Sequence, residues 1–306
     1  GENITLTIDS RLQRYIEEKL GDRRAAIVAI SPLNGEILAL VSTPTYDPNL
    51  FVDGINHTNY NALINNPNKP LINRAIRGQY PPGSTTKPFV ALGALEQGIT
   101  TTTERIFDPG YFEFQGHRYR NWRRQGHGWT DLKRSIVESV DTFYYKMSLD
   151  IGIDGLNSML SPFGFGERTG IDIPGEATGI LPSQEWKRAT HGESWYRGET
   201  IIASIGQGYN LATPIQLAQA TAILANRGRI IQPHLVKSGS SDIQNTTDLT
   251  SELDTTDQIP IRNRNHWEYV IQGMIDSVHT PRGTAWNAGR HIKDYQVAGK
   301  TGTAQV

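Results

Sequence analysis

The residue types suited to nucleophilic catalysis gather in residues 81–88, where a proline-rich loop leads into an apolar pattern typical of a buried helix. Ser84 and Lys87 are three residues apart and share one face of a helix, so the Lys87 amine can reach the Ser84 hydroxyl. An amine whose pKa is lowered by burial can act as the base that makes serine a nucleophile. Pro88 cannot donate to the Ser84 carbonyl, which predicts an irregular first turn. Because Ser-x-x-Lys also begins many ordinary helices, a catalytic role needs partners elsewhere in the chain.

A serine acyl-transfer site also needs a proton relay, an oxyanion hole and a clamp for the substrate. Ser139 and Asp141 offer a second hydroxyl and a carboxylate near the start of a predicted helix. The same Ser-x-Asp spacing occurs again at residues 148–150 and 240–242, so the spacing alone selects none of the three. The choice of Ser139 and Asp141 therefore depends on the other motifs of the chain.

Lys300, Thr301, Gly302 and Thr303 combine a cation and two hydroxyls with a glycine that lets another backbone approach closely. A strand of this kind can bind a substrate backbone as an added strand while its side chains hold a carboxylate. A similar Lys-Ser-Gly triplet at residues 237–239 opens a polar stretch, whereas Lys300 follows a predicted apolar strand. We therefore expect the substrate clamp at the Lys-Thr-Gly-Thr segment.

The composition excludes several classes of protein and of site. A formal net charge of −1 on 306 residues provides no basic footprint for nucleic acid. The chain has no cysteine, so disulfides and thiolate zinc sites are excluded. The longest apolar runs are too short to span a bilayer, and the start at Gly1, without a methionine or signal peptide, suggests a fragment of a longer protein. The sequence thus predicts a globular fragment with a substantial core.

Hydrophobic periodicity predicts an α+β domain. Helices are expected at 12–20, 84–98, 132–151, 215–225 and 267–278. Strands are expected at 3–9, 25–30, 36–41, 230–236 and 295–298, the second and third forming a hairpin through an Asn-Gly turn. Loops or turns are expected at 107–128 and 162–181, an extended irregular surface region at 43–80 and a mobile polar loop at 238–257. The antiparallel sheet would then be built from both ends of the chain, with a helical subdomain.

The set Ser-x-x-Lys, Ser-x-Asp and Lys-Thr-Gly is similar to the motifs of class A β-lactamases and penicillin-binding proteins. Between these motifs the chain resembles class B penicillin-binding proteins over nearly its whole length, in particular the elongation-type penicillin-binding protein 2 branch. The resembling stretches are 6–9 with 12–13, 31–39, 80–84, 107–110, 118–122, 126–128, 169–172 with 179, 205–209 and 213–216. The resemblance implies one transpeptidase domain over residues 1–306, with the penicillin-binding transpeptidase and serine β-lactamase-like fold.

By this resemblance the chain is expected to be a peptidoglycan D,D-transpeptidase that cross-links stem peptides during cell elongation and is a target of β-lactam antibiotics. Ser84 would attack the carbonyl between the two terminal D-alanines, and Lys87 would take its proton. Ser139 and Lys300 would relay the proton to the departing D-alanine. The amine of a second stem peptide would then attack the acyl-enzyme.

The resemblance also implies roles in substrate binding. Thr301 and Thr303, with Gly302 between them, would hold the terminal carboxylate of the substrate. The backbone N–H groups of Ser84 and Thr303 would form the oxyanion hole. Asp141 would orient the lysine base and contact the substrate amide, although most relatives outside this branch carry asparagine there.

A zinc site found in some members of this branch is not expected in this chain. Those members hold the ion near the Ser-x-Asp motif through Asp, Asp, His and Cys. Asp108 and His127 match two of these positions, but Asn121 and Val140 stand at the other two. Two ligands without a cysteine do not make a structural zinc site. The sequence therefore predicts no metal and no cofactor.

Residues 117–134 are rich in arginine and lysine interleaved with tyrosine and tryptophan. Such a composition occurs in nucleic-acid-binding patches, but a solvated loop is the preferred interpretation. We hypothesise that this segment favours anionic cell-wall precursors near the active site.

The family's domain continues past its Lys-Thr-Gly strand into further strands and a helix, whereas this sequence stops at Val306, which would leave the catalytic strand as an exposed edge. Either those elements follow in the complete protein or the molecule is a truncated one, and we favour the first. The resemblance further implies a membrane anchor outside the present chain and a location on the periplasmic face of the bacterial inner membrane. The implied partners are a glycan-polymerising membrane enzyme and rod-complex scaffold proteins.

Two other functions remain as alternatives. A serine β-lactamase needs a water activated for deacylation, and the chain shows no counterpart of the class A glutamate. The separation of Ser139 from Lys300 also exceeds that of this compact family. A β-lactam sensor domain acylates without turnover, but its family is shorter and lacks the region around residues 126–128. Both alternatives therefore rank below a transpeptidase.

Overall fold

The computed structural model describes residues 3–237 and 258–304, and the chain divides into two compact units. Unit 1 consists of Gly1–Gln79, Arg168–Thr178 and Thr213–Gln258. Unit 2 consists of Tyr80–Glu167, Gly179–Ala212 and Ile259–Val306. The predicted mobile loop at 238–257 lies outside the described residues.

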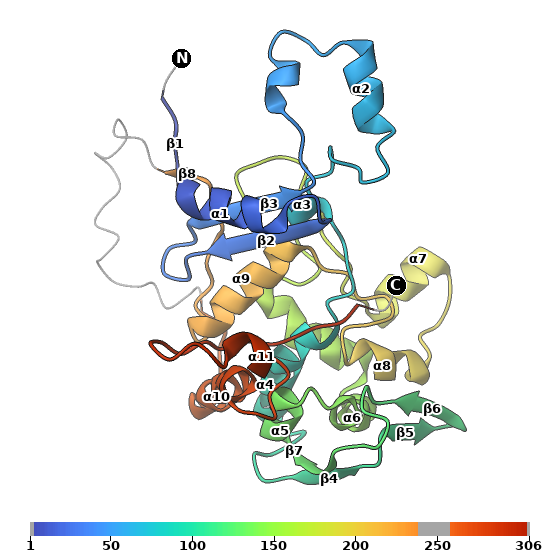
Figure 1. Cartoon of the computed structure of the whole chain (residues 1–306). Helices are drawn as coiled ribbons and strands as arrows, with labels where there is room; N and C mark the ends of the chain where they lie inside the picture. Colours follow the sequence, from blue (N-terminus) through green and yellow to red (C-terminus); the bar gives the residue numbers. More distant parts are fainter. Residues whose placement is uncertain (1–2, 238–257, 305–306) are drawn as a thin grey trace. The chain divides into compact units, whose positions relative to one another are not determined.

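Unit 1 is built around an antiparallel hairpin of β2 (Ala25–Ile30) and β3 (Ile37–Thr43) (Figure 1). Alternate residues of β3 are buried, as expected for a strand with one face on a core. Helix α1 (Ser10–Leu20), capped by the Asp9 carboxylate, packs on β3, and α9 (Pro214–Ala225) packs on β2. The predicted hairpin and its two helices are therefore confirmed.

The remaining elements of unit 1 are short. β1 (Thr5–Leu6) pairs with β8 (Val236–Lys237), so the strand predicted at 230–236 is reduced to its last residue and the one after it. Three helical segments occupy the region predicted as extended and irregular: η1 (Pro48–Phe51), α2 (His57–Ile64) and α3 (Arg74–Arg77). Asparagine caps start α2 and α3, and α3 places Ala75 and Ile76 in the core. That part of the prediction was wrong.

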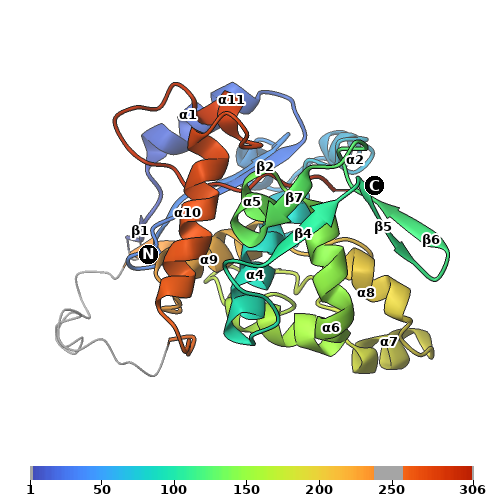
Figure 2. The ribbon, with the colours of Figure 1, turned by 90° about the horizontal axis from the view of Figure 1, so that it is seen from below.

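Unit 2 is organised by four helices: α4 (Lys87–Glu96), α5 (Leu132–Val137), α6 (Asp141–Leu160) and α10 (Asn265–His279). Figure 2 shows α4 beside α6 and α10, and α5 also packs against α10. Helix α4 is buried almost all round, which explains its continuous apolar sequence. Aromatic contacts tie the bundle together, with the ring of Phe163 4.8 Å from that of Phe89 and 6.1 Å from that of Trp267.

Two strand pairs occupy residues 107–128, where a loop was predicted. β4 (Arg105–Asp108) pairs with β7 (Gly128–Asp131), and β5 (Tyr111–Phe114) pairs with β6 (His117–Arg120). The inward positions of β4 hold Ile106 and the polar Asp108, so its sequence lacks the usual apolar alternation. The remaining short helices of unit 2 are η2 (Gly83–Thr86), η3 (Ser161–Phe163), α7 (Gln184–His191), α8 (Arg197–Ala203) and α11 (Trp286–Gly289).

The mixed α+β class is confirmed, but the strand predicted at 295–298 is absent from the described residues. The described strands form two-stranded ladders, and none of them includes residues 295–304. Other partners take up backbone groups of this segment: Gly299 N–H donates to Met274 O, and Val297 N–H donates to the His279 ring. Within 3–237 and 258–304, no helix combines the length and apolar character needed to cross a lipid bilayer.

Candidate active site

Ser84 lies in the short helix η2, which leads directly into α4. The N–H of Lys87 donates to Ser84 O, so the turn is of the tighter 3₁₀ type before the α-helix begins. The irregular first turn predicted from Pro88 is thus confirmed. Gly83, with a φ of +56°, allows the turn, and its N–H donates to Gly206 O at 2.9 Å.

The Lys87 amine is completely buried and makes three short contacts. Its Nζ lies 2.6 Å from Asp141 Oδ1, 2.9 Å from Ser139 O and 3.3 Å from Ser139 Oγ. In the part of the chain that the structure describes, no hydrogen bond joins this amine to the hydroxyl of Ser84. The sequence thus placed Lys87 at the site correctly. In the structure its amine donates to Ser139 and Asp141 of the Ser-x-Asp motif.

Ser139 stands in a break between α5 and α6, where a continuous helix over 132–151 was predicted. Its φ of +55° is left-handed, and Val140 N–H donates back to Ser135 O at 3.0 Å. The break leaves Ser139 O free for Lys87 and turns Ser139 Oγ toward a second amine, Lys300 Nζ, at 2.8 Å. One hydroxyl therefore bridges two lysines.

The two lysines have pKa values below the usual range of the side chain. Burial lowers the pKa of Lys87, and the Asp141 carboxylate opposes this effect. Burial and the nearby charge of Lys87 lower the pKa of Lys300 to about 7, again against the effect of Asp141. At neutral pH this arrangement can hold one amine as a base while the other carries a proton.

Five of the predicted residues line one cavity of about 640 Å³; they are Ser84, Ser139, Asp141, Thr301 and Thr303. Gly302 has no positive φ, but a Cβ there would lie 2.7 Å from Thr85 Cγ2 and 3.0 Å from Pro82 O. The close backbone approach predicted for this glycine is therefore confirmed. All eight predicted site residues come together in unit 2, because Lys87 and Lys300 both contact Ser139.

Sequence reasoning missed the residues that hold the Lys-Thr-Gly-Thr segment in place. Gln207 Nε2 donates to Thr303 O at 2.6 Å, while the adjoining Gly206 accepts from Gly83. Residues 205–209 resemble the family but received no role from the sequence, although a glutamine flanked by two glycines was a signal of a tight contact. Thr301 Oγ1 also donates to Thr284 Oγ1 at 2.7 Å. The first two bonds connect the Ser84 turn to Thr303.

Asp108, Asn121 and His127 form a buried hydrogen-bonded cluster behind Asp141. Asn121 Nδ2 donates to Asp108 Oδ2 at 2.7 Å and lies 3.2 Å from His127 Nδ1, which itself is 2.7 Å from Asp108 Oδ2. Burial alone would raise the pKa of Asp108, but hydrogen bonds from His127 and Gly110 outweigh it and hold that pKa below its usual range.

This cluster does not fit a structural zinc ion. The Asp108 carboxylate and the His127 ring contact each other directly, the amide of Asn121 donates a hydrogen bond to that carboxylate, and Val140 offers no ligand atom. Across residues 3–237 and 258–304, no group of three His, Cys, Asp or Glu side chains is placed to hold a metal ion. The absence of a metal stays a prediction.

Comparisons with known proteins match this chain to one family. Residues 25–306 match the model of the penicillin binding protein transpeptidase domain. The chain is 45% identical over 308 residues to the peptidoglycan D,D-transpeptidase MrdA of Escherichia coli strain K12. That match covers 100% of this chain and 48% of the relative, so the chain spans about half the length of the curated relatives it matches.

Solved structures give the same result. Pseudomonas aeruginosa PBP2 in complex with WCK 5153 superposes with a TM-score of 0.92 at 50% identity, covering 100% of this chain and 68% of that one. Helicobacter pylori PBP2 in its complex with MreC superposes with a TM-score of 0.88 at 35% identity, covering 99% of this chain and 55% of that one.

Proposed function

Because the chain belongs to the penicillin-binding protein transpeptidase family, we propose that it catalyses peptidoglycan D,D-transpeptidation through an acyl-enzyme on Ser84. The observation that carries the proposal is the Lys87–Ser139–Lys300 contact chain beside the cavity that Ser84 lines. It supplies a buried base and a proton path to the place where a leaving amine would form.

In the acylation step, Ser84 Oγ attacks the carbonyl carbon between the two terminal D-alanines of a donor stem peptide. The hydroxyl proton passes to the neutral amine of Lys87, whose lowered pKa favours that form. The tetrahedral intermediate then collapses as the carbon–nitrogen bond breaks. The departing D-alanine amine takes a proton through Ser139 Oγ, which both lysine amines contact.

In the second step, the amine of an acceptor stem peptide attacks the ester carbonyl of the acyl-enzyme. The attacking amine loses a proton to Lys87, the new amide bond forms, and Ser84 Oγ leaves and recovers its proton. The backbone N–H groups of Ser84 and Thr303 stabilise the oxyanion in both steps. The bond from Gln207 to Thr303 O supports this role, because it fixes the peptide backbone of that residue.

Substrate binding follows from the lining of the cavity. Thr301 and Thr303 offer hydroxyls to the terminal carboxylate, and Lys300 provides the nearby positive charge. Asp141 accepts from Lys87 and from the backbone N–H of Trp122, so it holds the base in position. β-Lactams that mimic the D-Ala-D-Ala end would acylate the same serine.

We further propose a cellular location and partners for the complete protein. It acts during cell elongation on the periplasmic face of the inner membrane, held by an anchor outside the present chain, and residues 1–306 belong to one transpeptidase domain. The partners are a glycan-polymerising membrane enzyme and rod-complex scaffold proteins, and the H. pylori PBP2 complex with MreC supports the latter class.

Intact-mass spectrometry of the complete protein with benzylpenicillin tests the proposal. We expect a stable adduct of one penicillin, absent from the Ser84→Ala variant, and release of D-alanine from a stem-peptide donor. An adduct lost within seconds would indicate a β-lactamase, and a stable adduct without D-alanine release would indicate a sensor. No adduct, or an adduct that survives Ser84→Ala, would overturn the assignment of the nucleophile.

A further inference from the structure

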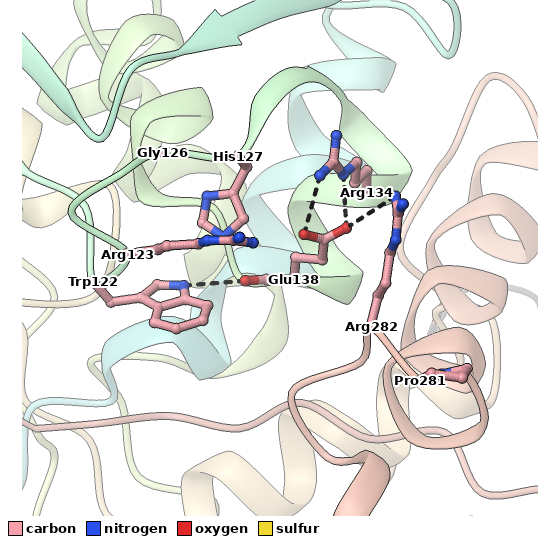
Figure 3. A pocket seen from close by; sticks show the side chains of 8 residues that line it. All are labelled: Trp122, Arg123, Gly126, His127, Arg134, Glu138, Pro281 and Arg282. Atoms are coloured by element: carbon pink, nitrogen blue, oxygen red, sulfur yellow. Dashed lines mark hydrogen bonds and ion pairs between the residues drawn. The ribbon is translucent and has the colours of Figure 1, made fainter.

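A second cavity, of about 470 Å³, lies beside the Ser84 cavity in the same unit. Arg123 and His127 reach toward it from one side and Arg134, Glu138 and Arg282 from the other (Figure 3). Trp122 lines both cavities, so the two spaces adjoin at its side chain.

The charges around this second cavity favour an anion. Glu138 supplies the one carboxylate that lines the cavity, and Arg134 pairs with it by donating to both carboxylate oxygens at 2.7 and 3.2 Å. Arg282 lies 3.9 Å from the same carboxylate, and its side chain remains 74% exposed. Arg123 has no ion-pair or hydrogen-bond partner for its guanidinium among the described residues. The Arg123 guanidinium can therefore bind a ligand, and the exposed Arg282, held only by its 3.9 Å ion pair to Glu138, can reach the same ligand.

A buried ring nitrogen also lacks a partner at this cavity. The His127 side chain is fully buried, and its Nδ1 is bonded to Asp108, but no described residue bonds to its Nε2. A buried polar atom without a partner is costly, and such atoms in native proteins often mark a ligand site. The unpartnered Nε2 is therefore a second, independent indication of a ligand at this cavity.

The second cavity is joined to the catalytic groups through Trp122. Its backbone N–H donates to Asp141 Oδ2 at 3.2 Å, and its indole Nε1 donates to Glu138 O at 3.1 Å, one residue before Ser139. A peptide bound across Trp122 would therefore reach from the acyl group on Ser84 to Arg123 and Arg282. The donor's terminal carboxylate already has its own hydroxyls at Thr301 and Thr303, so a second carboxylate site fits a second peptide.

We propose that the cavity between Arg123 and Arg282 binds a carboxylate of the acceptor stem peptide and so positions its amine toward the acyl-enzyme. This assignment rests on the proposed transpeptidase function. It gives the basic segment 117–134, which contains Arg123, a substrate-binding role that is specific to the second step.

The test compares the complete wild-type protein with Arg123→Ala/Arg282→Ala and with a control pair, Arg118→Ala/Arg264→Ala. The control arginines are exposed members of the same unit and line neither cavity. Each protein is given one donor peptide and either an acceptor peptide with free carboxylates or the same acceptor with its carboxylates amidated. The KM for the acceptor and the rate of Ser84 acylation by benzylpenicillin are measured separately.

In wild type and control, amidation should raise the acceptor KM about tenfold, as expected for the loss of one charge-assisted contact. In the Arg123/Arg282 variant the two acceptors should have nearly equal KM values, and penicillin acylation should match wild type. A variant that still distinguishes the acceptors, or a wild type that does not, would overturn the assignment.

Two further results would also decide against it. If the variant loses penicillin acylation, the arginines serve the Ser84 cavity itself. If amidating donor carboxylates other than the terminal one alters donor KM in wild type but not in the variant, the second cavity belongs to the donor. A wild type that forms no penicillin adduct would overturn the proposed function itself. That outcome can be told apart from failure of the acceptor site, because penicillin acylation is measured before any acceptor is added.

Discussion

Replacement of Asp141 by asparagine should move the pH dependence of Ser84 acylation to lower pH. Asp141 Oδ1 lies 2.6 Å from Nζ of Lys87, whose side chain is fully buried. The carboxylate stabilises the ammonium form and opposes the effect of burial on the Lys87 pKa. Asparagine has nearly the same shape but no charge, so the substitution removes the opposing effect and leaves the burial in place.

The size of the shift follows from this contact. Two unit charges 2.6 Å apart attract each other by about 6 kcal/mol at an effective dielectric constant of ~20. The asparagine oxygen still accepts a hydrogen bond, so only part of this energy is lost. Opposite charges at such range change a pKa by about one to three units, or roughly 1.4 to 4 kcal/mol. Since the lysine acts as a base when neutral, the ascending limb of the rate profile should move to lower pH by about one to two pH units.

The assay is the second-order rate of acylation by a fluorescent penicillin, measured from acid to alkaline pH. Asp276→Asn is the matched control, because Asp276 Oδ2 lies 2.7 Å from Lys133 Nζ in the same unit and outside the Ser84 cavity. This control should leave the ascending limb in place. Circular dichroism of each variant establishes that the fold is retained.

An ascending limb of Asp141→Asn that coincides with wild type, or that lies at higher pH, would refute the reasoning. Either result would mean that the limb reports a group other than Lys87, or that the carboxylate does not stabilise its charged form. A limb shifted equally in Asp276→Asn would trace the effect to net charge instead of the buried contact.

Three other predictions follow from the same contacts. Because the pKa of Lys300 is lowered to about 7, the charge of its amine is lost as pH rises through that value. The KM for a carboxylate-bearing donor should therefore rise on the alkaline side in wild type. It should not rise in Lys300→Arg, whose side chain stays charged. Gly83→Ala would set a Cβ 2.6 Å from Thr303 O at a φ of +56°. It should lower the free energy of unfolding, measured in urea, by about 2 kcal/mol or more. Gly98→Ala, whose Cβ would meet no atom within 4 Å, should lower it by about 1 kcal/mol. Asn121→Leu should lower the unfolding free energy by about 2 kcal/mol, because Asp108 loses a buried donor. Asn287→Ala on the exposed surface of the same unit should change it by less than about 0.5 kcal/mol.

Periodicity predicted the fold where one face of an element is apolar, as in α9, α10 and the β2–β3 hairpin. It failed at β4, where the inward Asp108 is stabilised by hydrogen bonds that a hydrophobicity pattern does not contain. It also failed at 295–298, whose apolar composition resembles a strand although helix α10 supplies its partners. Pairing partners distant in the chain decide such segments, and local sequence does not identify them.

The candidate site was predictable in its residue types and only partly in its contacts. The spacing of Ser84, Lys87 and Pro88 determined the tight turn, because each of its constraints is local. Gln207 could not be found in this way, since its bond to Thr303 O joins residues far apart in sequence. The same limit applies to Arg123 and Arg282, which only the folded chain brings to one cavity.

The backbone at Ser139 explains why the middle motif could not be placed by helix periodicity alone. A left-handed conformation costs a non-glycine residue about 1–2 kcal/mol, and glycine would adopt the observed φ of +55° without that cost. Glycine, however, would remove the Oγ that lies 3.3 Å from Lys87 Nζ and 2.8 Å from Lys300 Nζ. A continuous helix would also engage the carbonyl that now accepts from Lys87. The strain at this residue is therefore the condition under which one serine can contact both amines.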